Sequence, residues 1–245
     1  MTHHRRGLSG AVFAACIAAG ATPSTAQEGW DFNGYIYLWG AGIGGETVTG
    51  QDIEVSFGDI VDNLDFGLMG SLEANNGPWS IFGDALYLSV SKNQGAAVGP
   101  GIPANADVDV SGLVLTMGVG YDLLAEYTHR LNGFGGFRVL DMDTTANVAV
   151  AGGSQRLTDT INNWDAVVGL RGQVALNERW DLLYYADLGT GDSDLTWQAA
   201  LAAEYKFTNW SLGVGYRHLS WEIDKSRTLS DLAFSGPYVG AKWSF

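Results

Sequence analysis

The last segment of the chain alternates apolar residues with polar or small ones. The apolar positions are Pro237, Val239, Ala241, Trp243 and Phe245. The positions between them are Tyr238, Gly240, Lys242 and Ser244. A strict period of two indicates a β-strand with two different faces. The sequence therefore predicts a closing strand over Asp231 to Phe245, with one apolar face and an aromatic last residue.

The same alternation recurs along the chain, and we count ten such segments. Their ranges are 30–40, 64–75, 79–91, 108–123, 132–143, 161–176, 180–189, 195–207, 210–223 and 231–245. The connections after the second, sixth and eighth segments are two to four residues long, whereas those after the first, third and fifth are much longer. Short turns at one end and long loops at the other are typical of outer-membrane barrels. The pattern predicts an all-β fold, an antiparallel up-and-down transmembrane β-barrel of about ten strands, with eight to twelve possible.

Two parts of this pattern are irregular. In segment 79–91, turning Asp84 away from lipid also turns Leu86 and Leu88 away from it, which suggests a β-bulge. The stretch after the first segment, up to about Asn63, is expected to be a long polar connection. Within it, Ser56 to Asn63 is a candidate for a short helix that caps the lumen.

The nine tryptophans test the topology independently. On this topology, Trp30, Trp79, Trp180, Trp210 and Trp243 fall at the periplasmic strand ends, and Trp39, Trp164, Trp197 and Trp221 fall at or near the extracellular ends. Two aromatic belts are what a bilayer with two interfaces favours. The alternative is a soluble barrel with reversed faces, but a small lumen could not hold so many large apolar side chains.

Composition and charge narrow the picture further. The net charge is −14, with 27 acidic and 13 basic residues, which argues against a nucleic-acid partner. The N-terminus has a basic start, a small apolar run and a Ser24-Thr25-Ala26 ending, so residues 1–26 are expected to be a cleaved signal peptide and residues 27–245 the barrel domain. The single cysteine, Cys16, lies in that segment, where lipidation is a less favoured alternative, and the mature chain has none.

Three Gly-x-Arg triplets supply the candidate lumen chemistry. Alternation turns Arg138, Arg171 and Arg217 into the lumen, since a basic residue facing lipid at the midplane costs about 2–4 kcal/mol. Three acidic residues are candidates for the lumen face at a similar depth in the barrel: Asp84, Asp187 and Glu204. The glycine two residues before each arginine is expected to leave room for the guanidinium. We predict an ion-pair network that plugs a narrow barrel. A charged constriction that selects solutes is the alternative.

Catalytic, metal and cofactor signals are weak. His218 lies near Glu222 and Asp224, which makes an outer-membrane hydrolase with a rim His/acid site the alternative function. No His-x-x-x-His or Gly-x-Ser-x-Gly motif accompanies it, so we expect no enzyme, no cofactor and no metal site. Acidic residues in the outer connections suggest contact with lipopolysaccharide phosphates through divalent cations.

The chain resembles bacterial outer-membrane β-barrel proteins, among them small uncharacterised porin-like and surface-antigen-like barrels. The resemblance rests on the terminal Phe245 and on several stretches spread over most of the mature chain. These stretches are Tyr37-Leu38-Trp39, Asp84 with Tyr87, the Gly-x-Arg triplets, Ser193-Asp194-Leu195-Thr196-Trp197, and Gly236-Pro237. It implies a location in the outer membrane, contact with lipid and lipopolysaccharide, and recognition of Phe245 by the barrel-assembly machinery. It implies no catalytic residues.

The expected function follows from both lines of argument. The leading interpretation is an integral outer-membrane barrel with a structural or surface role, or a narrow passive channel. The runner-up is the hydrolase, and a third is a passive uptake pore for small or apolar molecules.

Overall fold

A computed structural model describes residues 29–47, 50, 52–62, 64–97, 103–150, 153–223 and 229–245. The expected signal peptide and Asp224 lie outside the described residues. The elements are β1 (Asp31–Trp39), β2 (Gly42–Thr47), β3 (Asp52–Val55), α1 (Phe57–Asp62), β4 (Leu64–Asn76), β5 (Trp79–Ala97), β6 (Pro103–Ala125), β7 (His129–Val150), β8 (Gly153–Ala175), β9 (Trp180–Gly191), β10 (Leu195–Lys206), β11 (Ser211–Glu222) and β12 (Leu229–Ser244). No helix among the described residues is both long and apolar enough to cross a membrane.

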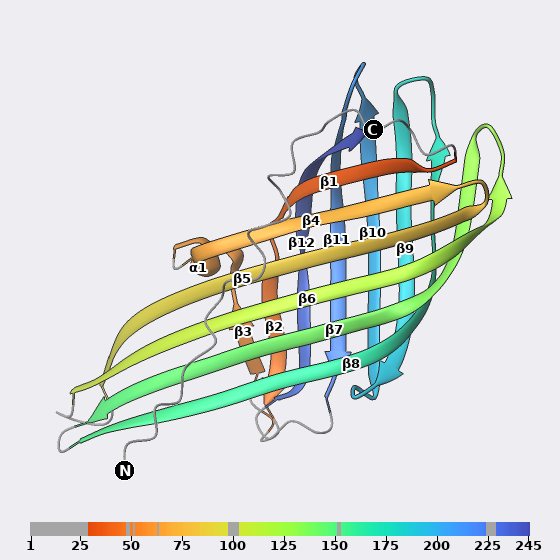
Figure 1. The fold of residues 1–245 in the computed structure, drawn as a ribbon. Coiled ribbons are helices and arrows are strands. Elements are labelled where there is room, and N and C mark those ends of the chain that lie inside the picture. Colours follow the sequence, from red (N-terminus) through yellow and green to blue (C-terminus); the bar gives the residue numbers. More distant parts are fainter. Residues whose placement is uncertain are drawn as a thin grey trace, which may run out of the picture.

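The strands form one antiparallel sheet that closes on itself (Figure 1). The ring runs from β1 through β4 and the following strands in sequence order to β12, which pairs back with β1. The closing contact is reciprocal: Phe32 N donates to Phe245 O at 3.1 Å, and Phe245 N donates to Phe32 O at 3.0 Å. The prediction of a ten-strand up-and-down barrel is thus confirmed.

Two further strands and a helix occupy the stretch expected to be a long polar connection. β2 continues the line of β1 and pairs with the first half of β12, while β3 folds back on β2 as a hairpin. The expected helix is present as α1 and leads into β4 (Figure 1). The sequence signal for β2 is poor because glycine has low β-propensity, and the strand depends on the long β12 for a pairing edge.

The barrel has two unlike ends. The C-terminal Phe245 and the tight turns lie at the short-turn end. The turn between β4 and β5 contains Gly77, whose φ of 56° is a backbone conformation that most other residues seldom adopt. At the long-strand end, β5 to β8 run well beyond the other strands (Figure 1). The ranges 92–107 and 144–160 were predicted as loops, but apart from 98–102 and 151–152, which are not described, they are paired hairpin arms.

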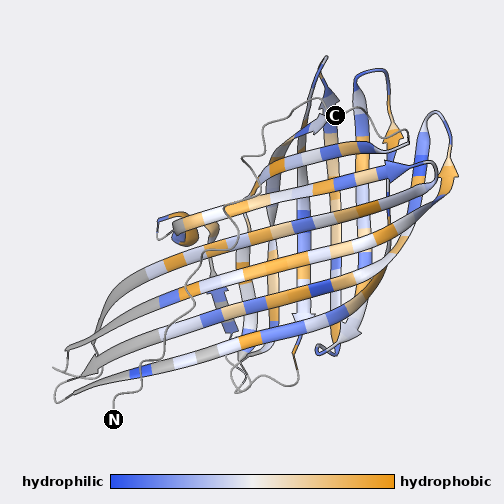
Figure 2. Ribbon diagram, viewed as in Figure 1, coloured by the Kyte–Doolittle hydropathy of each residue, from blue (hydrophilic) through white to orange (hydrophobic). Residues whose placement is uncertain are grey.

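Hydrophobic and hydrophilic residues follow one another in short bands along the strands (Figure 2). Because successive side chains of a strand point to opposite faces, the two faces of the wall differ in polarity. Large apolar residues point outward and stay exposed, including Ile36, Leu38, Leu72, Val168, Leu188, Leu201 and Val214. The suspected bulge in β5 is wrong, because its register with β6 is unbroken from Trp79 to Ala97. Leu86 and Leu88 do face inward, and Leu86 is only 3% exposed.

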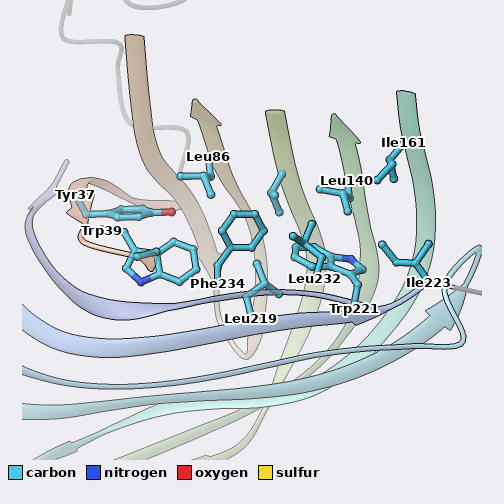
Figure 3. Packing of buried hydrophobic residues seen from close by; sticks show 12 residues of the cluster. Tyr37, Trp39, Leu86, Leu140, Ile161, Leu219, Trp221, Ile223, Leu232 and Phe234 are labelled. Carbon is cyan, nitrogen blue, oxygen red and sulfur yellow. The ribbon is translucent and has the colours of Figure 1, made fainter. Parts of the chain in front are cut away.

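The inward apolar residues pack together into one group of buried side chains, which we term the lumen cluster. It is built from β1, β5, β6, β7, β8, β11 and β12 and the residues next to them: Tyr37, Trp39, Ala41, Leu86, Val114, Leu140, Ile161, Leu219, Trp221, Ile223, Leu232 and Phe234. Figure 3 shows these side chains pointing toward one another. The rings of Trp39 and Trp221 both contact Phe234, with centroids 6.2 and 5.9 Å away.

The lumen cluster corrects part of the tryptophan prediction. Trp39 and Trp221 are 2% and 0% exposed, so they lie inside the barrel rather than in an outer aromatic belt. Trp164 and Trp197 are exposed on the outer face, as are four tryptophans near the short-turn end: Trp79, Trp180, Trp210 and Trp243. Burial of two of the nine tryptophans fills the interior at the long-strand end.

Candidate functional site: the barrel lumen

Arg138 is the most deeply buried charge in the lumen. Its Nη2 lies 2.5 Å from Asp187 Oδ2 on β9, and both side chains are fully buried. Nε and Nη1 donate to the hydroxyls of Thr116 and Thr196 at 3.2 and 3.0 Å. Tyr185 donates its hydroxyl to the same Asp187 oxygen. A buried guanidinium with donors directed at three other strands is held rigidly, because each lost bond leaves a desolvated polar group.

Arg217 on β11 reaches across the barrel to β5. Its Nη2 lies 2.9 Å from Asp84 Oδ1 and donates to Gln198 Oε1 at 2.8 Å. Nη1 donates to the Tyr37 hydroxyl at 3.0 Å, and that hydroxyl donates to Asp84 Oδ2 at 2.9 Å. The guanidinium also lies 4.8 Å from the centroid of the Trp39 ring. This arginine therefore joins the polar part of the lumen to the lumen cluster.

Arg171 on β8 forms a third cross-lumen contact. Its Nη1 lies 3.2 Å from Glu73 Oε2 on β4, and Nη2 donates to Ser80 Oγ at 3.0 Å. The guanidinium stacks 4.0 Å from the centroid of the Phe82 ring. Its carboxylate partner, Glu73, is not among the three acids predicted from the sequence. Glu73 belongs to the alternating segment 64–75, but its pairing with Arg171 depends on barrel closure.

Glu204 takes a partner that is not an arginine. Lys242 on β12 donates to it with Nζ 2.5 Å from Oε1. Lys242 falls on the inward face of the closing strand, which the alternation already showed. Two more bridges, Arg130 with Asp122 and Lys206 with Asp181, both at 2.9 Å, complete the polar lumen toward the short-turn end. The structure thus brings all six predicted residues into lumen salt bridges, but in separate pairs and with Glu73 and Lys242 as additional partners.

The glycines of the Gly-x-Arg triplets serve neighbours other than the arginines. A Cβ at Gly215 would lie 2.4 Å from Leu201 O and 2.8 Å from the ring of Tyr238. At Gly169 it would lie 2.6 Å from the ring of Phe134. No arginine atom is among the three nearest neighbours at these positions, so room for the guanidinium stays a prediction. They admit adjacent backbone and aromatic rings at the inner surface of a narrow barrel.

Polar and apolar layers follow one another along the strands. Two residues beyond Asp84, Arg138 and Arg217, toward the long-strand end, lie Leu86, Leu140 and Leu219 of the lumen cluster. On the other side of these charges is a cavity of about 260 Å³, whose lining includes Arg130, Arg171, Asp84, Arg217 and Tyr35. A cavity with such a lining can hold water or a small polar solute, and the lumen cluster lies between it and the long-strand end.

The groups considered for catalysis lie elsewhere. His218 points to the outer face, where its Nδ1 is 2.5 Å from Ser235 Oγ and its ring centroid is 4.4 Å from that of Trp197. His129 contacts the Tyr184 hydroxyl at 2.9 Å. Within the described part of the chain, no group of three or more His, Cys, Asp or Glu side chains could hold a metal ion.

Comparison with curated proteins gives no match. Among solved structures, the chain is similar to the translocator domain of the autotransporter NalP from Neisseria meningitidis, with 14% identity, a TM-score of 0.51, and coverage of 89% of this chain and 88% of that one. It is also similar to Ail, the attachment invasion locus protein of Yersinia pestis, with 13% identity, a TM-score of 0.42, and coverage of 89% and 99%. At such identities, the likeness to NalP shows the barrel fold alone.

A family model gives the broader assignment. The model of the outer membrane protein beta-barrel domain matches residues 12–218, which is most of the chain. The matched range includes β1 to β10 and the six lumen charges Asp84, Arg138, Arg171, Asp187, Glu204 and Arg217. With a closed barrel, an apolar outer face and this match, the chain belongs to the outer membrane protein beta-barrel domain family.

Proposed function

We propose that the protein is a closed outer-membrane barrel with a structural or surface role, and that it does not work as a passive channel. The observation that carries this proposal is the lumen cluster, whose side chains come from strands around most of the ring and are at most 9% exposed. An aqueous pathway would have to pass through this apolar layer. Dewetting of apolar constrictions makes ion passage costly even where a narrow gap exists.

The polar layer supports the same proposal. Arg217 with Asp84 and Arg171 with Glu73 join strands that are four places apart in the ten-strand ring, so their side chains cross the lumen. In a charged constriction, the side chains would line a central path. Here, each cation is neutralised by a directly bonded carboxylate, which is the arrangement of a plug.

Solute uptake by liposomes tests the proposal. Liposomes that contain the purified protein are placed in isosmotic solutions of small sugars and amino acids, and swelling is followed by light scattering. We expect swelling no faster than that of protein-free liposomes. Swelling that is faster and slows with solute size would reject the closed barrel in favour of a passive channel.

A second candidate, the outer-membrane hydrolase, rests on the close contact between His218 and Ser235 on the outer face. A histidine beside a hydroxyl is the core of a nucleophilic dyad. Against it, the Trp197 ring packs on the imidazole, with the ring centroids 4.4 Å apart. Hydrolysis of phospholipid and peptide substrates is measured for the wild type, His218→Ala and the control His129→Ala. Activity lost in His218→Ala alone would favour this candidate.

The proposed partners follow from the two ends and the outer face. The apolar outer wall contacts membrane lipid, and exposed acids at the long-strand end, such as Glu46 and Glu222, contact lipopolysaccharide through divalent cations. The closing strand with Phe245 engages the assembly machinery. The lipopolysaccharide proposal predicts that calcium or magnesium raises thermal stability in lipopolysaccharide-containing bilayers, and unchanged stability would reject it.

A further inference from the structure

The barrel wall has a gap in its hydrogen-bond ladder between β1 and β4. Pairing of these strands runs from Asp31 with Asn75 only as far as Ile36 with Gly70. Beyond that point, β1 and β2 pair with β12, and the first part of β4 pairs with β5. We call this region between residues 37–41 and 64–69 the seam. The other neighbouring strands of the ring pair over most of their shared length.

Side chains, rather than backbone pairing, close the seam. The Trp39 backbone N–H donates across the seam to the sulfur of Met69 on β4 at 3.2 Å. The Trp39 indole N–H donates in the other direction, to Gly236 O on β12, at 3.1 Å. α1 lies over this region, with Ile60 buried and Phe57 next to Gly40. An open sheet edge cannot face hydrocarbon with unsatisfied backbone groups, so these contacts satisfy or cover part of it.

Beneath α1, the seam encloses a cavity of about 210 Å³, which we call the seam pocket. Its lining is apolar from the outer face to the lumen cluster: Leu38, Trp39, Ala41, Phe57, Ile60, Val61, Gly67, Met69, Leu86, Leu88 and Phe234. Part of this lining lies at the outer surface, with Leu38 72%, Phe57 46% and Val61 48% exposed. The pocket therefore borders the side of the wall that faces hydrocarbon.

We propose that the seam pocket binds a small neutral apolar group taken from the bilayer. No charged side chain lines it, and its one polar side chain, Trp39, already has a hydrogen-bond acceptor. Burying a polar or ionised ligand there would cost several kcal/mol, by the general scale for unpaired groups. The exposed acids Asp59 and Asp62 on α1 further disfavour anionic amphiphiles.

The size of the pocket sets the size of the ligand. An apolar cavity of about 150 Å³ is sufficient for benzene in a soluble protein. A pocket of about 210 Å³ therefore accepts one ring with a short substituent, or the terminal segment of an alkyl chain. The source is either a small hydrocarbon dissolved in the membrane or the end of a lipid acyl chain, and both supply the same chemistry.

The methionines provide the test. Beside Met1 in the expected signal peptide, the chain has Met69 in the seam pocket, Met117 on the outer face and Met142 against the lumen cluster. The protein is labelled with ¹³C at its methionine methyl groups, purified in micelles and titrated with benzene. We expect a saturable shift at Met69, a shift at Met117 that only follows partitioning into the micelle, and little change at Met142.

Two substitutions separate pocket binding from general partitioning. Ala41→Leu fills the pocket and should abolish the saturable shift at Met69, and Leu88→Phe serves if that variant does not fold. The same change at Ala200, which lines the polar lumen cavity instead, should leave the shift intact. A non-saturable response at Met69, or a saturable one that survives both pocket-filling variants, would overturn the proposal.

The two sources are distinguished by the contacts that Met69 makes before benzene is added. Nuclear Overhauser contacts between the Met69 methyl and acyl-chain terminal methyls, which benzene then displaces, would identify the lipid chain as the resident group. A saturable benzene shift without such contacts would identify a dissolved small hydrocarbon. This site is independent of whether the lumen conducts, so a conducting barrel would not by itself contradict it.

Discussion

Arg217 on β11 and Asp84 on β5 meet inside the barrel with 2.9 Å between Nη2 and Oδ1, although their strands lie four places apart in the ring. The pair is mostly buried, with 7% and 20% of the side chains exposed. Tyr37 bonds to both partners. This contact holds two opposite parts of the wall together and fills the lumen between them.

Removal of one partner should therefore be costly. Asp84→Ala leaves a buried guanidinium without its carboxylate, and breaking such a pair costs about 3–5 kcal/mol. We expect a lower free energy of unfolding by about that amount in urea titrations of the protein in micelles. The double variant Asp84→Ala with Arg217→Met should recover a large part of the loss. Equal losses in the single and double variants would show that the charge pair is not the cause.

Arg171→Ala should not open the barrel. This substitution removes the contact with Glu73, but the lumen cluster on the other side of the polar layer stays intact. We expect the variant to remain silent in planar-bilayer recordings, with only reduced stability. Steady openings in this variant alone would place the barrier to ions in the ion-pair layer.

The lumen cluster should behave like the core of a soluble protein. Leu219 is fully buried, so Leu219→Ala leaves a cavity and should lower the free energy of unfolding by about 2–5 kcal/mol. Leu201, on the outer face, is 54% exposed. Leu201→Ala should cost less, because lipid fills the space and only the transfer term is lost. Similar losses in both variants would argue against a packed interior.

The role of the terminal Phe245 in assembly can be tested against Phe32, the residue on which it stacks. Phe245 stacks on Phe32 with ring centroids 6.1 Å apart, a contact worth about 0.5–1.5 kcal/mol beyond burial. Phe245→Ala and Phe32→Ala should therefore lower stability in vitro by similar amounts. In cells, we expect only Phe245→Ala to reduce the folded, heat-modifiable fraction in the outer membrane. Equal effects in cells would mean that the stacking alone matters.

How far the sequence predicts this molecule depends on the range of each interaction. Alternation along one strand is a local signal, so it predicts that Arg138, Arg171 and Arg217 turn inward, and in the structure each forms a salt bridge. Which acid each arginine meets depends on register and closure over the whole ring, which are not local. The pairing of Glu73 with Arg171 and of Lys242 with Glu204 could therefore not be predicted from their own strands.

The lumen cluster was missed for a related reason. In a membrane barrel, apolar residues are expected to face outward, so an inward apolar residue resembles an interruption of the alternation. Leu86 and Leu88 were therefore interpreted as evidence of a bulge. The signal was present in Leu140 and Leu219 as well, each two residues beyond an inward arginine. β2 and the seam could not be predicted, because the glycines of β2 give little strand signal and its pairing edge is supplied by the distant β12.

Single-channel recording in a planar bilayer tests the closed lumen most directly. The wild type is compared with a variant in which Trp39, Trp221 and Phe234 are all replaced by alanine, and near-ultraviolet circular dichroism and heat modifiability establish that both are folded. We predict silence from the wild type and ion-conducting openings from the variant, because water enters once the aromatic layer is removed. Steady openings of the folded wild-type barrel would contradict the account.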